Sequence, residues 1–183
     1  METLVDISQY DSRFSLRNKV GRLAWNLVYW LLFRPFAPGP LRPWRIFLLR
    51  SFGARVDRTA NVYASCRIWA PWNLRMGKFA CLGPGVDCYN QGSISIGDHT
   101  IVSQKAYLCA STHDHTQRNF PLVLRPIAIE DQAWVAAEAF IGPGVTVGQG
   151  AVVGARSAVF RNVAPWSVVG GNPATFIKNR DVQ

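Results

Sequence analysis

The sequence predicts an all-β solenoid, a tower of short stacked strands, with a helical appendage at its N-terminus. Aliphatic residues recur at strict intervals of six, at Ile129, Val135, Ile141, Val147, Val153 and Val159. Glycine directly follows three of them, at Gly142, Gly148 and Gly154. Residues 1–55 lack this period and are instead basic and rich in aromatic side chains. A period of six fits neither an amphipathic helix nor simple strand alternation, and it is typical of a repeat solenoid.

A three-sided coil explains the period. Each six-residue unit forms one side and points its aliphatic residue inward, and small residues after the aliphatic positions allow the chain to turn the corner. Three sides make a coil of about eighteen residues whose backbone pairs with the coils above and below it. A sandwich of strands would instead show turn signals about every 8–12 residues.

The same spacing extends upstream in three further series. It is present at Val56, Val62 and Ile68, at Met76, Leu82 and Cys88, and after a two-residue shift at Ile96, Val102 and Leu108. We therefore expect the solenoid over residues 56–163 and a short C-terminal segment over residues 164–183. At 183 residues the chain is long enough for one domain with an appendage.

The appendage, residues 1–55, carries most of the excess charge. The protein has a net charge of +9. Residues 1–55 hold three acids and nine basic residues, which are Arg13, Arg17, Lys19, Arg22, Arg34, Arg42, Arg45, Arg50 and Arg55. Basic charge can indicate a nucleic-acid partner, but no recognised nucleic-acid motif accompanies it, so we expect none.

An apolar run over residues 23–33 lies inside this basic segment, followed by a proline-rich turn and a second amphipathic stretch over residues 44–52. The run is about half as long as a transmembrane helix requires, and no small-residue cleavage site follows it. Two interpretations remain. The run caps the open end of the solenoid, or it lies in a membrane interface with its arginines on anionic lipid. In the second case the side chains among the headgroups are Trp25, Tyr29, Trp30 and Phe33.

The four cysteines show no C-x-x-C pair and no paired histidine spacing. A disulfide framework and a structural zinc site are therefore poorly supported, and reduced thiols in the cytoplasm are expected. We therefore expect a cytoplasmic location, with peripheral contact at the inner face of the cytoplasmic membrane if the second interpretation holds.

The six-residue period stops between Leu108 and Ile129, and the excursion over residues 109–128 contains two of the three histidines, His113 and His115. Insertions in repeat proteins lie outside the stack and often form the functional face. Both histidines are therefore candidates for catalysis.

The repeat, residues 107–114 with the sequence Tyr-Leu-Cys-Ala-Ser-Thr-His-Asp, and the ending Gly170-Gly-Asn-Pro-Ala174 resemble the left-handed β-helix acyltransferases of the hexapeptide-repeat family. The nearest likeness is to the exopolysaccharide O-acetyltransferases of the colanic-acid-biosynthesis type. Residues 33–55 are also similar to these enzymes, so the resemblance covers nearly the whole chain. The resemblance implies a homotrimer that uses acetyl-CoA as cosubstrate. The acceptor it implies is a sugar hydroxyl on a lipid-linked or nucleotide-linked glycan.

The resemblance places the catalytic histidine at His113. A sugar hydroxyl is a poor nucleophile, and an imidazole that titrates near neutrality can take its proton during attack on the thioester. His115 is the alternative base if the loop register differs, and otherwise a substrate residue. In similar enzymes an acidic or amide side chain holds the histidine or the acceptor. Asp87 is the candidate for the catalytic partner and Asn90 for substrate binding, although either residue can instead belong to a corner turn.

The cofactor residues are also implied by resemblance. Small residues and backbone groups beside the pantetheine arm correspond to Ala137 and Ala155, and basic residues near the nucleotide phosphates to Arg161 and Lys178. Thr175 occupies a position that is commonly basic, which weakens the phosphate expectation. Trp134 corresponds to a tryptophan near the thioester, or it packs between coils.

Three other functions are weighed against O-acetylation. One is N-acetylation of an amino sugar, and another is a non-catalytic scaffold, against which the intact histidine loop argues. A γ-class carbonic anhydrase shares the fold but holds zinc with three histidines. This chain has only His99, His113 and His115, and two of them share one loop. We therefore expect no metal site.

Overall fold

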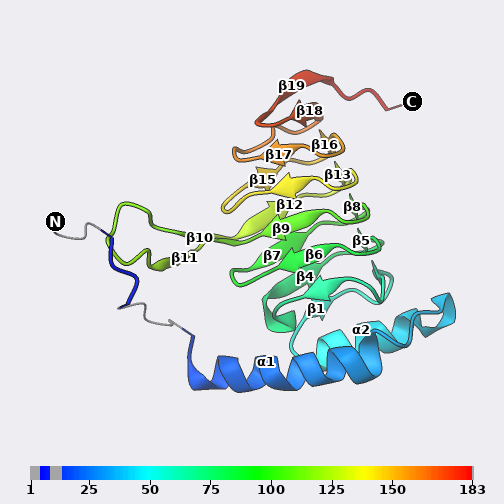
Figure 1. Ribbon diagram of the computed structural model, residues 1–183. Helices are drawn as coiled ribbons and strands as arrows, with labels where there is room; N and C mark the ends of the chain where they lie inside the picture. Colours follow the sequence, from blue (N-terminus) through cyan, green and yellow to red (C-terminus); the bar gives the residue numbers. More distant parts are fainter. Residues whose placement is uncertain (1–4, 9–13, 183) are drawn as a thin grey trace.

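The computed structural model describes residues 5–8 and 14–182, so Arg13 of the basic segment lies outside the described residues. It shows a tower of parallel strands standing on two N-terminal helices (Figure 1). This confirms the prediction of an all-β solenoid with a helical appendage.

Three parallel sheets form the sides of the tower. The first sheet contains β1 (Arg55–Val56), β4 (Leu74–Met76), β7 (Ile94–Ile96), β12 (Ile127–Ile129) and β15 (Thr146–Val147). The second contains β2 (Asn61–Val62), β5 (Cys81–Leu82), β8 (Ile101–Val102), β13 (Trp134–Val135), β16 (Val152–Val153) and β18 (Ser167–Gly171), with β19 (Ala174–Asn179) antiparallel at its C-terminal edge. The third contains β3 (Arg67–Ile68), β6 (Asp87–Tyr89), β9 (Tyr107–Cys109), β14 (Phe140–Ile141) and β17 (Ala158–Val159).

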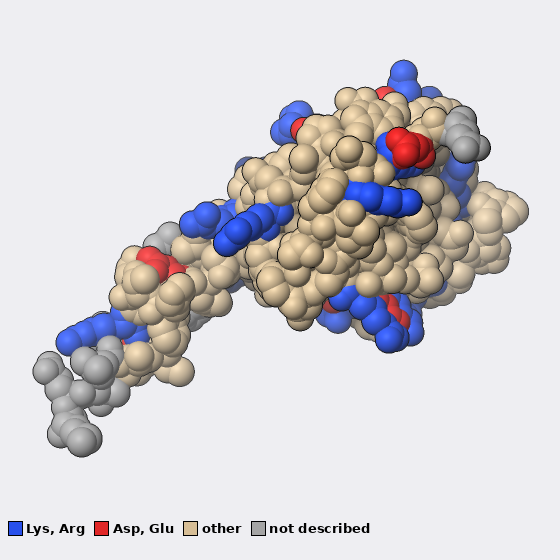
Figure 2. Space-filling view, turned by 90° about the horizontal axis from the view of Figure 1, so that it is seen from above, with Lys and Arg blue, Asp and Glu red and all other residues tan. Residues whose placement is uncertain are grey.

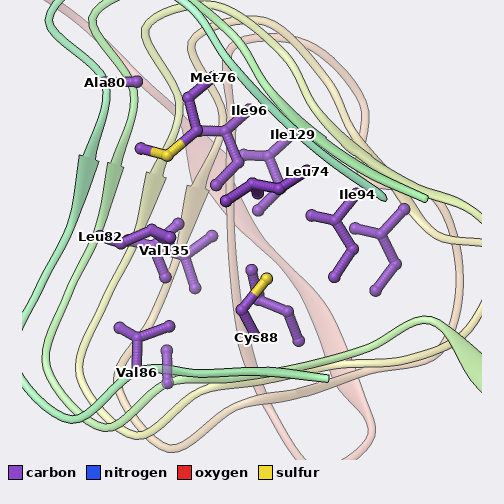
Figure 3. Packing of buried hydrophobic residues seen from close by; sticks show 14 of the residues in the cluster. Leu74, Met76, Ala80, Leu82, Val86, Cys88, Ile94, Ile96, Ile129 and Val135 are labelled. Atoms are coloured by element: carbon purple, nitrogen blue, oxygen red, sulfur yellow. The ribbon is translucent and has the colours of Figure 1, made fainter. Parts of the chain in front are cut away.

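The aliphatic residues of the six-residue period form the core. In Figure 3, Met76, Leu82, Ile96, Ile129 and Val135 point into one interior between the three sheets. Each is at most 4% exposed. Strands of two or three residues suffice because each side of the coil buries one such residue and pairs with the coils above and below it.

The two-residue shift in the spacing of the inward residues corresponds to an enlarged corner in the first coils. Val56 pairs with Met76 and Met76 with Ile96, which are steps of twenty residues, whereas Ile129 pairs with Val147, a step of eighteen. The additional residues lie between the third sheet and the first, where the short 3-10 helix η3 (Pro71–Asn73) forms.

The glycines after the inward residues have a different role from the one expected. They do not adopt left-handed backbone; that conformation occurs two residues later, for example at Phe79 after Gly77 and at His99 after Gly97. A Cβ on Gly97 would lie 2.5 Å from the backbone nitrogen of Asp131 in the next coil, so Gly97 makes room for the neighbouring backbone. The glycine directly after an inward residue is therefore needed for close stacking of the coils rather than for the left-handed bend itself.

The appendage consists of α1 (Leu16–Val28), the π-helical turn η1 (Tyr29–Phe33), the 3-10 turn η2 (Gly39–Leu41) and α2 (Arg42–Ser51). Ser15 caps α1 by accepting a hydrogen bond from the Asn18 amide at 3.2 Å. The appendage packs on the N-terminal end of the solenoid. The indole of Trp25 donates to the carbonyl oxygen of Ile68 at 2.7 Å, and the guanidinium of Arg45 donates to that of Val62 at 2.9 Å.

This packing corrects the expected membrane residues. Trp25, Tyr29 and Phe33 are buried against the solenoid and cannot lie among lipid headgroups, whereas Trp30 is 60% exposed. The reason is that these three residues share the inward face of the helix, and Trp30 does not. In the described part of the chain, no helix is long and apolar enough to cross a membrane.

Candidate functional site

The break in the six-residue period is a hairpin arm, formed by β10 (Ser111–His113) and β11 (Leu122–Leu124). The two strands are antiparallel, with His113 opposite Leu122. The arm stands out from the body of the molecule in both views (Figures 1 and 2). At its tip, the amide of Asp6 donates to the carbonyl oxygen of Arg118 at 2.9 Å.

His113 is exposed at the end of β10, and its tautomer is fixed by a backbone contact. Its Nδ1 lies 2.6 Å from the carbonyl oxygen of Phe120. A carbonyl oxygen only accepts, so Nδ1 carries the proton. In the neutral ring Nε2 is then the basic atom, which is the arrangement that a general base requires.

Asp114 orders the turn of the arm rather than the histidine. Its Oδ1 accepts from the Thr116 hydroxyl at 2.6 Å and amide at 3.0 Å, and its Oδ2 accepts from the Gln117 side chain at 2.9 Å. The hydrogen bonds from Thr116 hold the pKa of the Asp114 carboxyl below its ordinary value. His115 is exposed in this turn, and it lines a shallow hollow together with His113.

Asp87 lies elsewhere, in a groove of about 580 Å³ between α1 and the third sheet. Its carboxylate is 3.6 Å from the guanidinium of Arg67. Burial raises the pKa of the Asp87 carboxyl, and the charge of Arg67 opposes that shift. Among the described residues, the hollow with His113 and the groove with Asp87 share no lining residue, whereas the sequence had suggested one groove for both.

The groove contains cationic and aromatic groups that sequence reasoning missed. The guanidinium of Arg22 lies 3.7 Å from the ring centroid of Trp69, and burial lowers its pKa from the ordinary arginine value. Arg34 donates to the Tyr29 hydroxyl at 3.3 Å. Arg22 and Arg34 flank the apolar run in the sequence, and this was the available signal. Only the docking of α1 on the third sheet places them near Asp87.

Asn90 has a structural role in place of the expected contact with substrate. It is fully buried, its Oδ1 accepts from the Ala70 amide at 3.0 Å, and its Nδ2 donates to the Ala70 carbonyl oxygen at 2.6 Å. Both polar atoms of the side chain thus connect two successive coils. We therefore leave Asn90 out of the site.

The residues expected along coenzyme A lie at several places on the tower. Ala137 and Ala155 occupy the same corner of successive coils, where the amide of Arg156 donates to the Ala137 carbonyl oxygen at 2.9 Å. Trp134 is 46% exposed and donates to the Ser103 hydroxyl at 2.9 Å. Arg161 follows the third sheet at a different corner, and Lys178 lies on β19. Both basic side chains are exposed.

The described residues hold no group of three or more His, Cys, Asp or Glu side chains that could bind a metal ion. His99 is at a corner of the tower, stacked on Phe79 with ring centroids 4.9 Å apart. The four cysteines are free. Burial raises the pKa of the Cys66 thiol to about 12, so this thiol stays protonated and unreactive near neutral pH.

Comparison with known proteins adds the family. The sequence matches no protein-family model. WcaF of Escherichia coli strain K12, named as a colanic acid biosynthesis acetyltransferase, is 43% identical over 145 residues, which cover 79% of this chain and 80% of that protein. VCA0836 of Vibrio cholerae O1 biovar eltor, a hexapeptide-repeat acetyltransferase solved with acetyl-CoA, has a TM-score of 0.80 at 23% identity and covers 98% of this chain and 97% of that one. A maltose O-acetyltransferase from Clostridium difficile 630 has a TM-score of 0.79 at 24% identity, with 92% and 90% covered.

The two solved structures share the fold of this chain, and the relative from Escherichia coli is similar over most of both sequences. This chain contains both the repeating coils and the arm that carries His113. The protein is therefore a hexapeptide-repeat acetyltransferase.

Proposed function

We propose that the protein transfers an acetyl group from acetyl-CoA to a sugar hydroxyl during synthesis of a bacterial surface polysaccharide, with His113 as the general base. The observation that carries this proposal is the backbone-fixed tautomer of His113 on the exposed arm. WcaF is named for colanic acid biosynthesis, the solved maltose enzyme is an O-acetyltransferase, and VCA0836 was solved with acetyl-CoA. These names support the polymer, the hydroxyl acceptor and the cosubstrate.

The proposed chemistry is direct transfer. The sugar oxygen attacks the thioester carbonyl carbon while Nε2 of His113 takes the hydroxyl proton. When the tetrahedral intermediate collapses, the new C–O bond remains and the C–S bond breaks. The imidazolium then returns the proton to the departing thiolate. The Phe120 carbonyl, which accepts from Nδ1, stabilises the imidazolium between these two steps.

We further propose a homotrimer with active sites shared between subunits, as is typical of the family, and with the coils in a left-handed course. The separation of His113 and Asp87 within one chain supports this arrangement. An arm that stands out from its own tower is suited to present His113 to the groove of a neighbouring subunit. Coenzyme A would then lie along the tower, with Trp134, Ala137, Ala155, Arg161 and Lys178 as the predicted contacts.

The groove at Asp87 is the proposed acceptor site, and the protein is proposed to act in the cytoplasm. The Asp87 carboxylate in this groove can accept a hydrogen bond from a sugar hydroxyl. The guanidinium groups of Arg22, Arg34 and Arg67 suit a phosphate attached to that sugar. This combination favours a lipid-linked or nucleotide-linked sugar.

The test uses labelled acetyl-CoA with a panel of lipid-linked sugars, nucleotide sugars and amino sugars. We expect a product whose label is released by mild alkali, because an ester is cleaved under conditions that leave an amide intact. His113→Ala should lower turnover about 10²- to 10⁴-fold. His99→Ala, at a corner of the tower where the ring stacks on Phe79, is the matched control and should stay near wild type. An alkali-stable product would make the protein an N-acetyltransferase, and near-normal turnover of His113→Ala would remove His113 as the base.

A further inference from the structure

The outward face of α1 and η1 carries an apolar row that the solenoid does not cover. Its members are 58–77% exposed. They follow each other at intervals of three or four residues apart from the final pair, at Leu16, Val20, Leu23, Leu27, Trp30 and Leu31. At 100° per residue these positions lie on one side of the helix, opposite the inward side that holds Trp25, Tyr29 and Phe33. The helix therefore has two apolar sides, of which only one is used in the fold.

The position of this row leaves it accessible to a flat surface. Helix α1 lies across the N-terminal end of the tower, at the bottom of Figure 1. Its outward side faces away from the three sheets. The arm and the coils extend in other directions, so an extended planar partner can reach the row.

The charges around the row indicate which class of partner is complementary to it. Residues 14–55 contain no Asp or Glu and eight basic residues, all of which except the buried Arg45 are at least partly exposed. Arg17 and Lys19 are both exposed, and the helical period puts them on the two opposite edges of the row. Two copies of this face would repel each other. An apolar stripe between basic edges is instead complementary to anionic lipid, whose headgroups pair with the cations while the apolar side chains enter the acyl boundary.

We propose that this face docks the protein on an anionic membrane surface, with α1 and η1 lying flat in the interface. The α1–η1 segment is about 27 Å long at 1.5 Å per residue, so the row is long enough for several lipids along its length. Trp30 lies at the end of the row and also lines the groove that contains Asp87. Docking would therefore hold this groove at the headgroup level, where a phosphate of a lipid-linked molecule is presented. The docking itself does not depend on the proposed acetyl transfer.

The experiment is flotation of the full-length protein with vesicles of phosphatidylcholine, with or without phosphatidylglycerol, at low and high salt. We expect binding to the anionic vesicles at low salt and a large loss at high salt. Leu23→Gln with Leu27→Gln should lower the bound-to-free ratio at least tenfold, since both side chains would enter the acyl boundary. Arg17→Gln and Lys19→Gln should each lower it about fivefold on anionic vesicles only.

Ile177→Gln is the matched control. This side chain is 60% exposed on β19, at the opposite end of the tower, and should bind like wild type. Circular dichroism should be unchanged in all variants, because the substituted side chains lie outside the core. Failure of the wild type to bind any vesicle, or equal binding by Leu23→Gln/Leu27→Gln, would overturn the proposal. So would loss of self-association in that variant without vesicle binding, which would assign the face to a protein partner.

Discussion

Substitution of Asn90 by alanine tests whether this residue serves the fold or the acceptor. The change removes two hydrogen bonds and leaves the amide and the carbonyl of Ala70 without their side-chain partners in a fully buried place. Each buried backbone group left unsatisfied costs about 1–3 kcal/mol, so the free energy of unfolding should fall by about 2–6 kcal/mol. For a chain of this size, that corresponds to a fall in Tm of about 5–20 °C.

The assay is thermal unfolding followed by circular dichroism, combined with steady-state kinetics at a temperature where the variant is folded. Asn61→Ala is the control, because the Asn61 amide makes only a long 3.9 Å contact with the Cys81 sulfur and its loss should cost about 0.5 kcal/mol or less. We expect a lower Tm for Asn90→Ala with KM for the acceptor unchanged. An unchanged Tm with a raised KM would refute the structural role and restore Asn90 to the substrate site.

Three further predictions follow from the geometry of the coils and the arm. Gly97→Ala should lower Tm by several degrees, because its Cβ would meet the Asp131 backbone at 2.5 Å. Gly39→Ala is the control and should leave Tm unchanged, because among the described residues no atom lies within 4 Å of the new Cβ. Equal Tm values in the two variants would contradict the stacking role. Mixed trimers of His113→Ala and Asp87→Asn, each inactive alone, should regain about one quarter of wild-type activity if each site takes one residue from each of two subunits, and no recovery would place the site within one chain. The turn of the arm should loosen in acid, because the hydrogen bonds from Thr116 lower the pKa of the Asp114 carboxyl. The ionised carboxylate therefore contributes its stability in full above the ordinary pKa of 3.8, and that stability is lost as pH falls through the lower folded pKa. Titration of the carboxylate by NMR would detect this loss.

The sequence predicted the core well because burial in a solenoid follows directly from spacing. Residues such as Ile129 and Val135 recur every six positions, and each is buried in the structure. The position of His113 outside the stack was also predictable, since an interruption of a regular repeat can be seen without knowledge of the third dimension. The antiparallel pairing inside the excursion was not, because three-residue strands leave no clear periodic signal.

The errors have a common physical cause, which is that each depended on contacts between distant segments. The sequence could not separate Trp25 from Trp30, because both sides of α1 are apolar and only docking on the solenoid decides which one is covered. The sequence left Asn90 between substrate binding and a corner turn because its hydrogen-bond partner, Ala70, is twenty positions away. Asp87 and His113 were expected in one groove because the register gave their heights on the tower but not the direction of the arm.

The coils stack at a constant backbone spacing, so the height of any element along the tower can be counted in coils. Trp25 bonds to Ile68 of β3, and the arm leaves the tower after β9, which stands two coils higher in the same sheet. At about 4.8 Å per coil, the root of the arm is about 10 Å from the level at which α1 is fixed. The height of the histidine above the base of the molecule thus changes only in whole steps. Inserting one coil below β9 would raise it by about 4.8 Å, while coils added above the arm would lengthen the tower and leave that height unchanged.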